Sequence, residues 1–147
     1  MSTVFIYSAD KHRIIKNINS LRSRMKPGET GFARIKDAMG YSIKGLVFTW
    51  KNEAAFRQEC VIAVILIPLA FFIAPSLEKV ILLTIPVFLL SIVELINSAI
   101  EAAIDRFGDE QHVLSGAAKD IGSAAVFVSL IFLSFTWTIM LLDIFFL

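Results

Sequence analysis

The sequence predicts an all-α integral membrane protein, in which an amino-terminal amphipathic surface helix precedes three transmembrane helices. Hydrophobic residues make up 56% of the 147 residues, and the mean hydropathy is +0.73. This is too apolar for a small soluble domain of ordinary composition. Three stretches, at about 54–74, 80–100 and 124–142, are long and apolar enough to cross a hydrocarbon core of about 30 Å. Positive charge is concentrated early, because 11 of the 14 Lys and Arg residues lie at or before Arg57.

The chain before the first span is interrupted at 26–31, where one proline and two glycines favour a turn. We therefore expect a basic amino-terminal extension at 1–30 and a membrane domain at 31–147. The apolar residues of the extension recur at helical spacing between Lys and Arg residues. This pattern fits a basic helix on an anionic membrane surface, and it fits equally an extension without a role. Residues 32–50 form a second amphipathic segment, predicted to be a surface helix with its apolar side toward lipid.

The distribution of charge predicts the topology. Residues 75–79 are too few for anything but a tight turn between antiparallel helices. Positive residues favour the cytoplasm, so we expect the amino terminus and the connection at 102–119 on that side, and the carboxyl terminus on the other. Residues 1–30 lack the apolar segment of a signal peptide. Cys60 is the only cysteine, which excludes an intrachain disulfide and a thiolate metal cluster.

The strongest functional signal is a row of polar residues that continues the second span. Glu94, Asn97, Ser98, Glu101 and Asp105 are spaced so that they share one face of an α-helix. A carboxylate at membrane depth costs on the order of 3 kcal/mol by insertion scales, and it usually marks a functional site. Carboxylates on one face repel each other unless a cation or a proton lies between them. Oxygen ligands of this kind suit Mg²⁺ that arrives with phosphates.

Other polar groups have a structural interpretation beside a functional one. Glu53 and Arg57 are i, i+4 neighbours at the start of the first span and could simply form an ion pair. In the second connection, Lys119 could bind phosphate and His112 a nucleotide, but a solvated loop with a helix cap at Ser115 fits equally well. The glycines at 40 and 45 are not followed by Lys and Ser or Thr, so the phosphate-binding loop of soluble nucleotide-binding proteins is absent.

Three segments resemble the prokaryotic diacylglycerol kinase family. They are Glu-Ala-Ala-Phe-Arg-Gln-Glu at 53–59, Val-Glu-Leu-Ile-Asn-Ser-Ala-Ile-Glu-Ala-Ala-Ile-Asp-Arg at 93–106, and Ala-Lys-Asp-Ile-Gly-Ser-Ala-Ala at 118–125. The similarity runs from about Gly31 to the third span. It is closer to the Gram-negative diacylglycerol kinases than to the related undecaprenol kinases. Two features depart from the family pattern: the stretch before Gly31 has no counterpart, and Ala117 stands where a basic residue is expected.

The resemblance implies a homotrimer in the bacterial inner membrane, with active sites between subunits near the cytoplasmic interface. It implies that the protein transfers a phosphoryl group directly from ATP to diacylglycerol, with Mg²⁺ as cofactor, and so makes phosphatidic acid. The expected partners are then diacylglycerol, ATP and other copies of the same chain, and no nucleic acid is expected.

The resemblance also assigns roles to residues at matching positions. Glu94 would be the general base that accepts the proton of the lipid hydroxyl, and Glu53 and Glu101 would hold Mg²⁺. The residues that would surround the nucleotide are Arg34, Tyr41, Glu53, Glu101, Glu110, Gln111, His112, Lys119 and Asp120. The residues that would form the lipid-substrate and polar site are Arg34, Ser42, Glu59, Glu94, Asn97 and Ser123.

Alternative functions follow from the same residues. A kinase for undecaprenol or another lipid alcohol would use the same chemistry. A proton- or cation-translocating membrane subunit would use Glu94 and Glu101 as relay groups, but it leaves the similarity of the nucleotide-binding connection without a purpose. A purely structural trimeric membrane protein is the third alternative. Phosphorylation of diacylglycerol in mixed micelles, compared with ion flux in liposomes, separates the first two classes.

Overall fold

The computed structural model describes residues 31–106 and 112–146, all of which belong to helices or to the short segments between them. The expected basic extension at 1–30, with Glu110 and Gln111, lies outside the described residues. The chain divides into two compact units, Met1–Ser42 and Ile43–Leu147.

Helix α2, Phe32–Asn52, occupies the range predicted for the surface helix and extends across the boundary between the units. Gly31 precedes it with a φ of 79°, a left-handed conformation that glycine adopts without the steric cost of a Cβ. Large apolar side chains on α2, such as Phe32 and Ile35, are exposed. That α2 is a helix is therefore observed, and its position on a membrane surface stays a prediction.

The end of α2 is held by an arginine of the next helix. The Arg57 guanidinium donates hydrogen bonds to the carbonyls of Trp50, at 2.8 Å, and Lys51, at 3.4 Å. Carbonyls in the last turn of a helix have no partner within the helix, so a cation there satisfies them. The simple Glu53–Arg57 ion pair allowed by the sequence is not formed, because the backbone of α2 provides the acceptors for Arg57 instead.

Three long helices form the second unit: α3, Ala54–Ile73; α4, Leu77–Asp105; and α5, Val113–Phe146. All three are long and apolar enough to cross a membrane, which confirms the predicted number of candidate spans. The turn before α4 is short, and the Ser76 hydroxyl caps α4 by accepting from Lys79 N at 3.4 Å. Both α4 and α5 extend beyond the predicted spans 80–100 and 124–142, because they continue as helices through the polar residues that flank their apolar centres.

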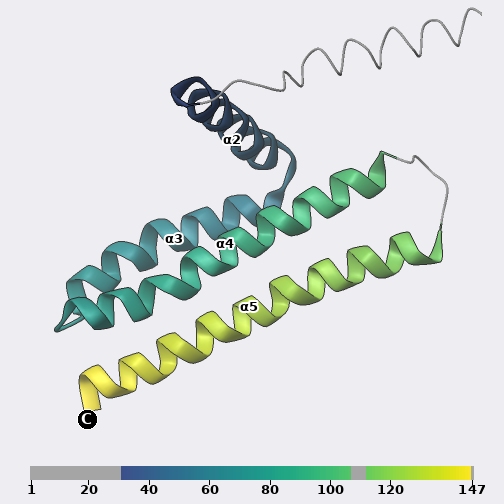
Figure 1. The fold of residues 1–147 in the computed structure, drawn as a ribbon. Coiled ribbons are helices and arrows are strands. Elements are labelled where there is room, and N and C mark those ends of the chain that lie inside the picture. The colour runs from purple at the N-terminus through teal and green to yellow at the C-terminus, as the bar shows by residue number, and fades with distance from the viewer. Residues whose placement is uncertain (1–30, 107–111, 147) are drawn as a thin grey trace, which may run out of the picture. The chain divides into compact units, whose positions relative to one another are not determined.

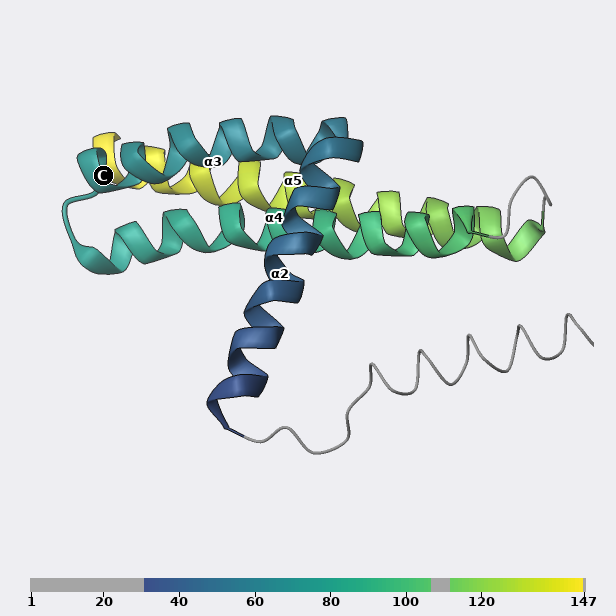
Figure 2. The ribbon, with the colours of Figure 1, turned by 90° about the horizontal axis from the view of Figure 1, so that it is seen from above.

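Figures 1 and 2 show α3, α4 and α5 running side by side, and α4 packs against both of the other helices. The core lies toward the end of the bundle near the α3–α4 turn. At its centre, the Trp137 indole donates to the carbonyl of Leu83 at 3.0 Å. Pro86 lies in the next turn of α4, where its missing N–H removes a helical hydrogen bond. The buried core residues are Ala70, Leu83, Val87, Leu90, Leu133, Trp137 and Met140.

Helices α4 and α5 are antiparallel, with ion pairs at both ends of their contact. Lys79 near the start of α4 pairs with Asp143 near the end of α5, at 2.6 Å. Asp105 at the end of α4 pairs with Lys119 near the start of α5, also at 2.6 Å. These pairs and the Trp137–Leu83 hydrogen bond define one register between the two helices. We call this pair of helices the α4–α5 hairpin.

Candidate active site

The polar face of α4 is turned into the second unit at its centre and emerges toward its end. Glu94 is 3% exposed, and Asn97 and Ser98 are also buried. Glu101 is half-buried and Asp105 is exposed. The stripe thus passes from a buried to an exposed position within three turns of α4.

Glu94 lies at the centre of a group of carboxylates. Glu101 and Glu53 act electrostatically on Glu94, and Glu94 acts on Glu59 of α3. Glu59 is 6% exposed, and its Oε2 has no hydrogen-bond partner among the residues that the structure describes. Burying carboxylates together is costly without a proton or a cation. The arrangement is therefore typical of a site that binds or transfers protons or cations. We call these four residues, Glu53, Glu59, Glu94 and Glu101, the carboxylate cluster.

Asn97 links the buried and the exposed parts of this site. Its Nδ2 donates to Glu101 Oε1 at 2.9 Å. Its Oδ1 is buried and has no partner in the described part of the chain, and the same is true of Ser98 Oγ. A buried polar atom without a partner costs roughly 1–3 kcal/mol. Their concentration beside Glu94 distinguishes this region from the rest of the bundle.

A lysine from α5 approaches the carboxylate cluster. Lys119 pairs with Asp105, and the charges of Glu101 and Glu53 also act on it. Both partners of this ion pair are solvent-accessible, and such pairs contribute little to stability. Lys119 can therefore exchange Asp105 for a phosphate at small cost, as the sequence allowed.

The start of α5 corrects one expectation. The helix begins at Val113, and His112 is its cap: Nδ1 accepts from Leu114 N at 3.2 Å, and the His112 carbonyl accepts from the N–H groups of Ser115 and Gly116. The cap proposed at Ser115 was wrong, because Ser115 lies inside the helix. His112 remains exposed, so a nucleotide contact competes with its capping role.

The other predicted site residues that the structure describes are exposed on α5 or α2. Asp120 and Ser123 are exposed on α5. Three residues, Arg34, Tyr41 and Ser42, lie in the first unit and are exposed on α2, where the Ser42 hydroxyl donates to the Ala38 carbonyl at 3.0 Å. The second unit thus brings together the carboxylate cluster, Asn97 and Lys119. The three residues of the first unit are not placed relative to it.

The donor set fits a magnesium ion that is bound together with phosphates. In the described ranges, no group of three or more His, Cys, Asp or Glu side chains forms a ready metal cage. Mg²⁺ usually takes only one or two carboxylates, several waters and the phosphates of its substrate. Glu53 and Glu101 supply two carboxylates that act on the same neighbours, Glu94 and Lys119. They suit this mode of binding.

Sequence reasoning missed Gly122. It is buried in α5, and a Cβ built at this position would collide with Asn97 Oδ1 and lie 3.3 Å from Asn97 Cγ. The available signal was weak, since a glycine inside a helical pattern indicates only that packing or a close approach is possible.

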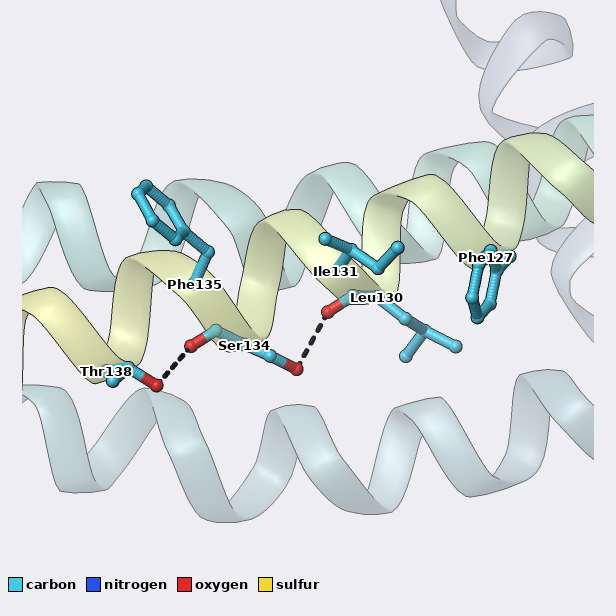
Figure 3. Close-up of a pocket in the computed structure, with 6 residues that line it drawn as sticks. All are labelled: Phe127, Leu130, Ile131, Ser134, Phe135 and Thr138. Carbon is cyan, nitrogen blue, oxygen red and sulfur yellow. Dashed lines mark hydrogen bonds between the residues drawn. The ribbon is translucent and has the colours of Figure 1, made fainter.

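A hollow elsewhere on α5 has a different character. It has a volume of about 450 Å³. Figure 3 shows the α5 side chains that line it. Its two hydroxyls are both occupied within the helix, because Ser134 donates to the Leu130 carbonyl and Thr138 to the Ser134 carbonyl. It provides no titratable group for chemistry. The residues that line it are Phe127, Leu130, Ile131, Ser134, Phe135 and Thr138.

Comparison with known proteins identifies the family. The family described as "Prokaryotic diacylglycerol kinase" matches residues 40–141. The diacylglycerol kinase of Escherichia coli strain K12 is 50% identical over 117 residues, which are 80% of this chain and 96% of the relative. The diacylglycerol kinase of Pseudomonas aeruginosa is 48% identical over 115 residues, or 78% of this chain and 94% of the relative. That of Haemophilus influenzae is 46% identical over 108 residues, or 74% and 92%.

The family match covers α3, α4 and α5 up to residue 141, and it includes the carboxylate cluster and Lys119. These matches confirm the resemblance drawn from the three sequence segments and the expected enzyme class, a lipid kinase. The chain therefore belongs to the prokaryotic diacylglycerol kinase family.

Proposed function

We propose that the protein transfers the γ-phosphoryl group of ATP to diacylglycerol, making phosphatidic acid at the cytoplasmic face of the bacterial inner membrane. The observation that carries this proposal is the buried Glu94 among the carboxylate cluster, on a helix that could span the membrane. A lipid alcohol reaches such a site sideways from the bilayer, and ATP reaches the exposed end of the same polar stripe from water. Membership in the family supports both reactants.

Glu94 acts as the general base in this proposal. One carboxylate oxygen accepts the proton of the lipid hydroxyl as the hydroxyl oxygen bonds to the γ-phosphorus, and the bond from that phosphorus to the bridging oxygen of ADP breaks. Burial excludes competing water, so the phosphoryl group goes to the lipid rather than to hydrolysis. Most of the rate enhancement in such a reaction comes from alignment and from neutralisation of charge.

Glu53 and Glu101 would hold Mg²⁺ through their carboxylates, and the ion would supply positive charge for the phosphate oxygens of ATP. Asn97 holds Glu101 through the 2.9 Å hydrogen bond, so that the carboxylate keeps one orientation. Lys119 binds a phosphate oxygen in place of Asp105. By position in the family pattern, Glu59 and Ser123 would complete the polar site with Glu94 and Asn97.

The other nucleotide contacts are proposed by position in the family pattern. His112 precedes α5 and Asp120 follows Lys119 within it, and both are exposed; Glu110 and Gln111 precede them in the chain. Arg34, Tyr41 and Ser42 on α2 would contact the nucleotide or the lipid headgroup. Ala117, in place of a basic residue, would remove one phosphate contact from this set.

We also propose a homotrimer with active sites shared between subunits, with the amino terminus in the cytoplasm. Many large apolar side chains of α3 and α5 are exposed in the single chain, and a trimer would cover part of this surface. Co-assembly of a Glu53→Gln chain with a Glu94→Gln chain tests the sharing. Recovered activity would mean that the two carboxylates of a site come from different subunits. No recovery in verified mixed trimers would mean that one subunit supplies both.

The decisive experiment measures ATP-dependent phosphorylation of diacylglycerol in mixed micelles. A panel that adds undecaprenol and a simple long-chain alcohol distinguishes the lipid-alcohol kinases from one another. Proton or cation flux through liposomes containing the purified protein tests the translocation alternative. Flux without phosphorylation of any lipid would overturn the proposal.

A further inference from the structure

The contact between Gly122 and Asn97 points to a role that the carboxylates alone do not reveal. Gly122 is buried on α5, opposite the polar face of α4. The glycine leaves space that Asn97 Oδ1 occupies, because a Cβ on residue 122 would collide with that oxygen. The amide of Asn97 therefore lies against the backbone of α5 with no side chain between them.

This position determines which way the amide points. With Oδ1 against Gly122, Nδ2 is directed along α4 to Glu101 Oε1, at 2.9 Å. The reversed amide would place an oxygen against the carboxylate, where two acceptors repel. Oδ1 is buried without a partner in the part of the chain that the structure describes. The amide thus leaves one acceptor unsatisfied while it holds Glu101.

We propose that Gly122 is a positioning residue: it admits the Asn97 amide to the helix interface, and through Asn97 it orients the Glu101 carboxylate toward the metal-nucleotide. This inference rests on the proposed function for the identity of that ligand. A methyl group at 122 forces either Asn97 to rotate away from Glu101 or α5 to move away from α4. In both cases Glu101 loses the partner that fixes its orientation.

The chain contains a matched control. Gly116 is the other glycine of α5, and a Cβ there would meet nothing within 4 Å. Gly116→Ala and Gly122→Ala make the same chemical change in the same helix, and both raise its intrinsic helix propensity. Any difference between the two variants comes from the surroundings of the glycine.

The test measures binding of Mn²⁺, as a paramagnetic substitute for Mg²⁺, to the full chain in micelles with a non-hydrolysable ATP analogue. Loss of a group that orients a metal ligand typically weakens metal affinity by about 10–100-fold. We expect Gly122→Ala to weaken Mn²⁺ binding at least about tenfold and to raise the Mg²⁺ concentration needed for half-maximal activity more than it lowers kcat. Gly116→Ala should match the unmodified protein. Equal Mn²⁺ affinities for the two alanine variants would overturn the proposal.

A double variant tests whether the effect passes through Asn97. In an Asn97→Ala background the methyl group at 122 has room, so adding Gly122→Ala should change Mn²⁺ affinity no further. Full additivity of the two losses would contradict the proposal. If Gly122→Ala alone does not fold, thermal unfolding should show that the double variant folds, and failure of the double variant would equally contradict it.

The proposed function can fail independently. An unmodified protein that phosphorylates no lipid alcohol, but whose Mn²⁺ affinity still depends on Gly122, would refute the kinase activity and retain the positioning role. Normal phosphorylation of diacylglycerol by both alanine variants, with unchanged Mn²⁺ affinity, would refute only the role of Gly122.

Discussion

Both halves of the α4–α5 hairpin bury polar groups, but they differ in whether those groups have hydrogen-bond partners. In the half near the α3–α4 turn, the Trp137 N–H meets the Leu83 carbonyl within an apolar core. In the other half, Glu94 and Asn97 are just as buried but lie among carboxylates, and Asn97 Oδ1 lacks a partner. The satisfied polar group of the first half stabilises the fold. In the second half, buried polar groups without partners destabilise it at the place where the chemistry is proposed.

This contrast separates two kinds of substitution. Changes in the half containing Trp137 should alter the free energy of unfolding and leave the activity of the folded enzyme unchanged. Substitutions that remove a buried charge from the half containing Glu94 should do the reverse, because the loss of an unfavourable buried charge does not destabilise the bundle. We therefore expect stability and activity to respond to different ends of the same two helices.

The largest effect is expected for Glu94→Gln. The amide retains the size of the side chain but cannot accept the substrate proton, and general base catalysis is typically worth about 10²–10⁴-fold. We expect kcat to fall by that factor while thermal stability is maintained or increased. Glu78→Gln, the same change at an exposed position on α4, is the control. Near-normal turnover of the Glu94 variant would exclude it as the base.

Trp137→Phe should have the clearest effect on stability. The ring remains apolar but loses its N–H, so the buried carbonyl of Leu83 loses its donor at a cost of about 1–3 kcal/mol. Chemical or thermal unfolding in micelles measures the loss, and kcat of the folded fraction should be unchanged. Trp50→Phe, at a tryptophan residue that is 49% exposed, is the matched control. Equal destabilisation by both substitutions would show that the Trp137–Leu83 hydrogen bond contributes nothing.

Glu53→Gln and Glu101→Gln should each change the metal requirement. Each substitution removes one anionic oxygen ligand from the proposed Mg²⁺ site. We expect the Mg²⁺ concentration for half-maximal activity to rise about tenfold or more, measured at saturating ATP and lipid. A variant with unchanged Mg²⁺ dependence and normal activity would remove that residue from the ligand set.

The two ion pairs at the ends of the hairpin provide the most direct comparison. Lys79–Asp143 and Lys119–Asp105 have the same 2.6 Å separation and are both solvent-accessible. Lys79→Met should change the free energy of unfolding by less than about 1 kcal/mol and leave KM for ATP unaltered. Lys119→Met should raise KM for ATP severalfold with little change in stability. The same KM for both variants would exclude Lys119 from the nucleotide site.

The local features of the chain were predictable because helical periodicity is a local property. The row from Glu94 to Asp105 could be recognised from spacing alone, and the structure places its first members inside the bundle and its last at the surface. The exact ends of α4 and α5 were not predictable, because hydropathy locates the apolar part of a helix, whereas both helices continue into polar residues at their ends. The cap at His112 was missed for a related reason, since serine is the commoner N-cap and only the position of the helix start excludes it.

The sequence by itself determined three long apolar helices and one polar stripe, because length, hydropathy and a repeat of 3.6 residues need no knowledge of neighbouring helices. Only the tertiary structure decided which groups meet. The register between α4 and α5 brings Gly122 to Asn97 and Trp137 to Leu83. The break before α3 turns Arg57 toward the carbonyls of α2 rather than toward Glu53. The local sequence allows several residues as partners in each case. Packing between the helices determines which of them is contacted.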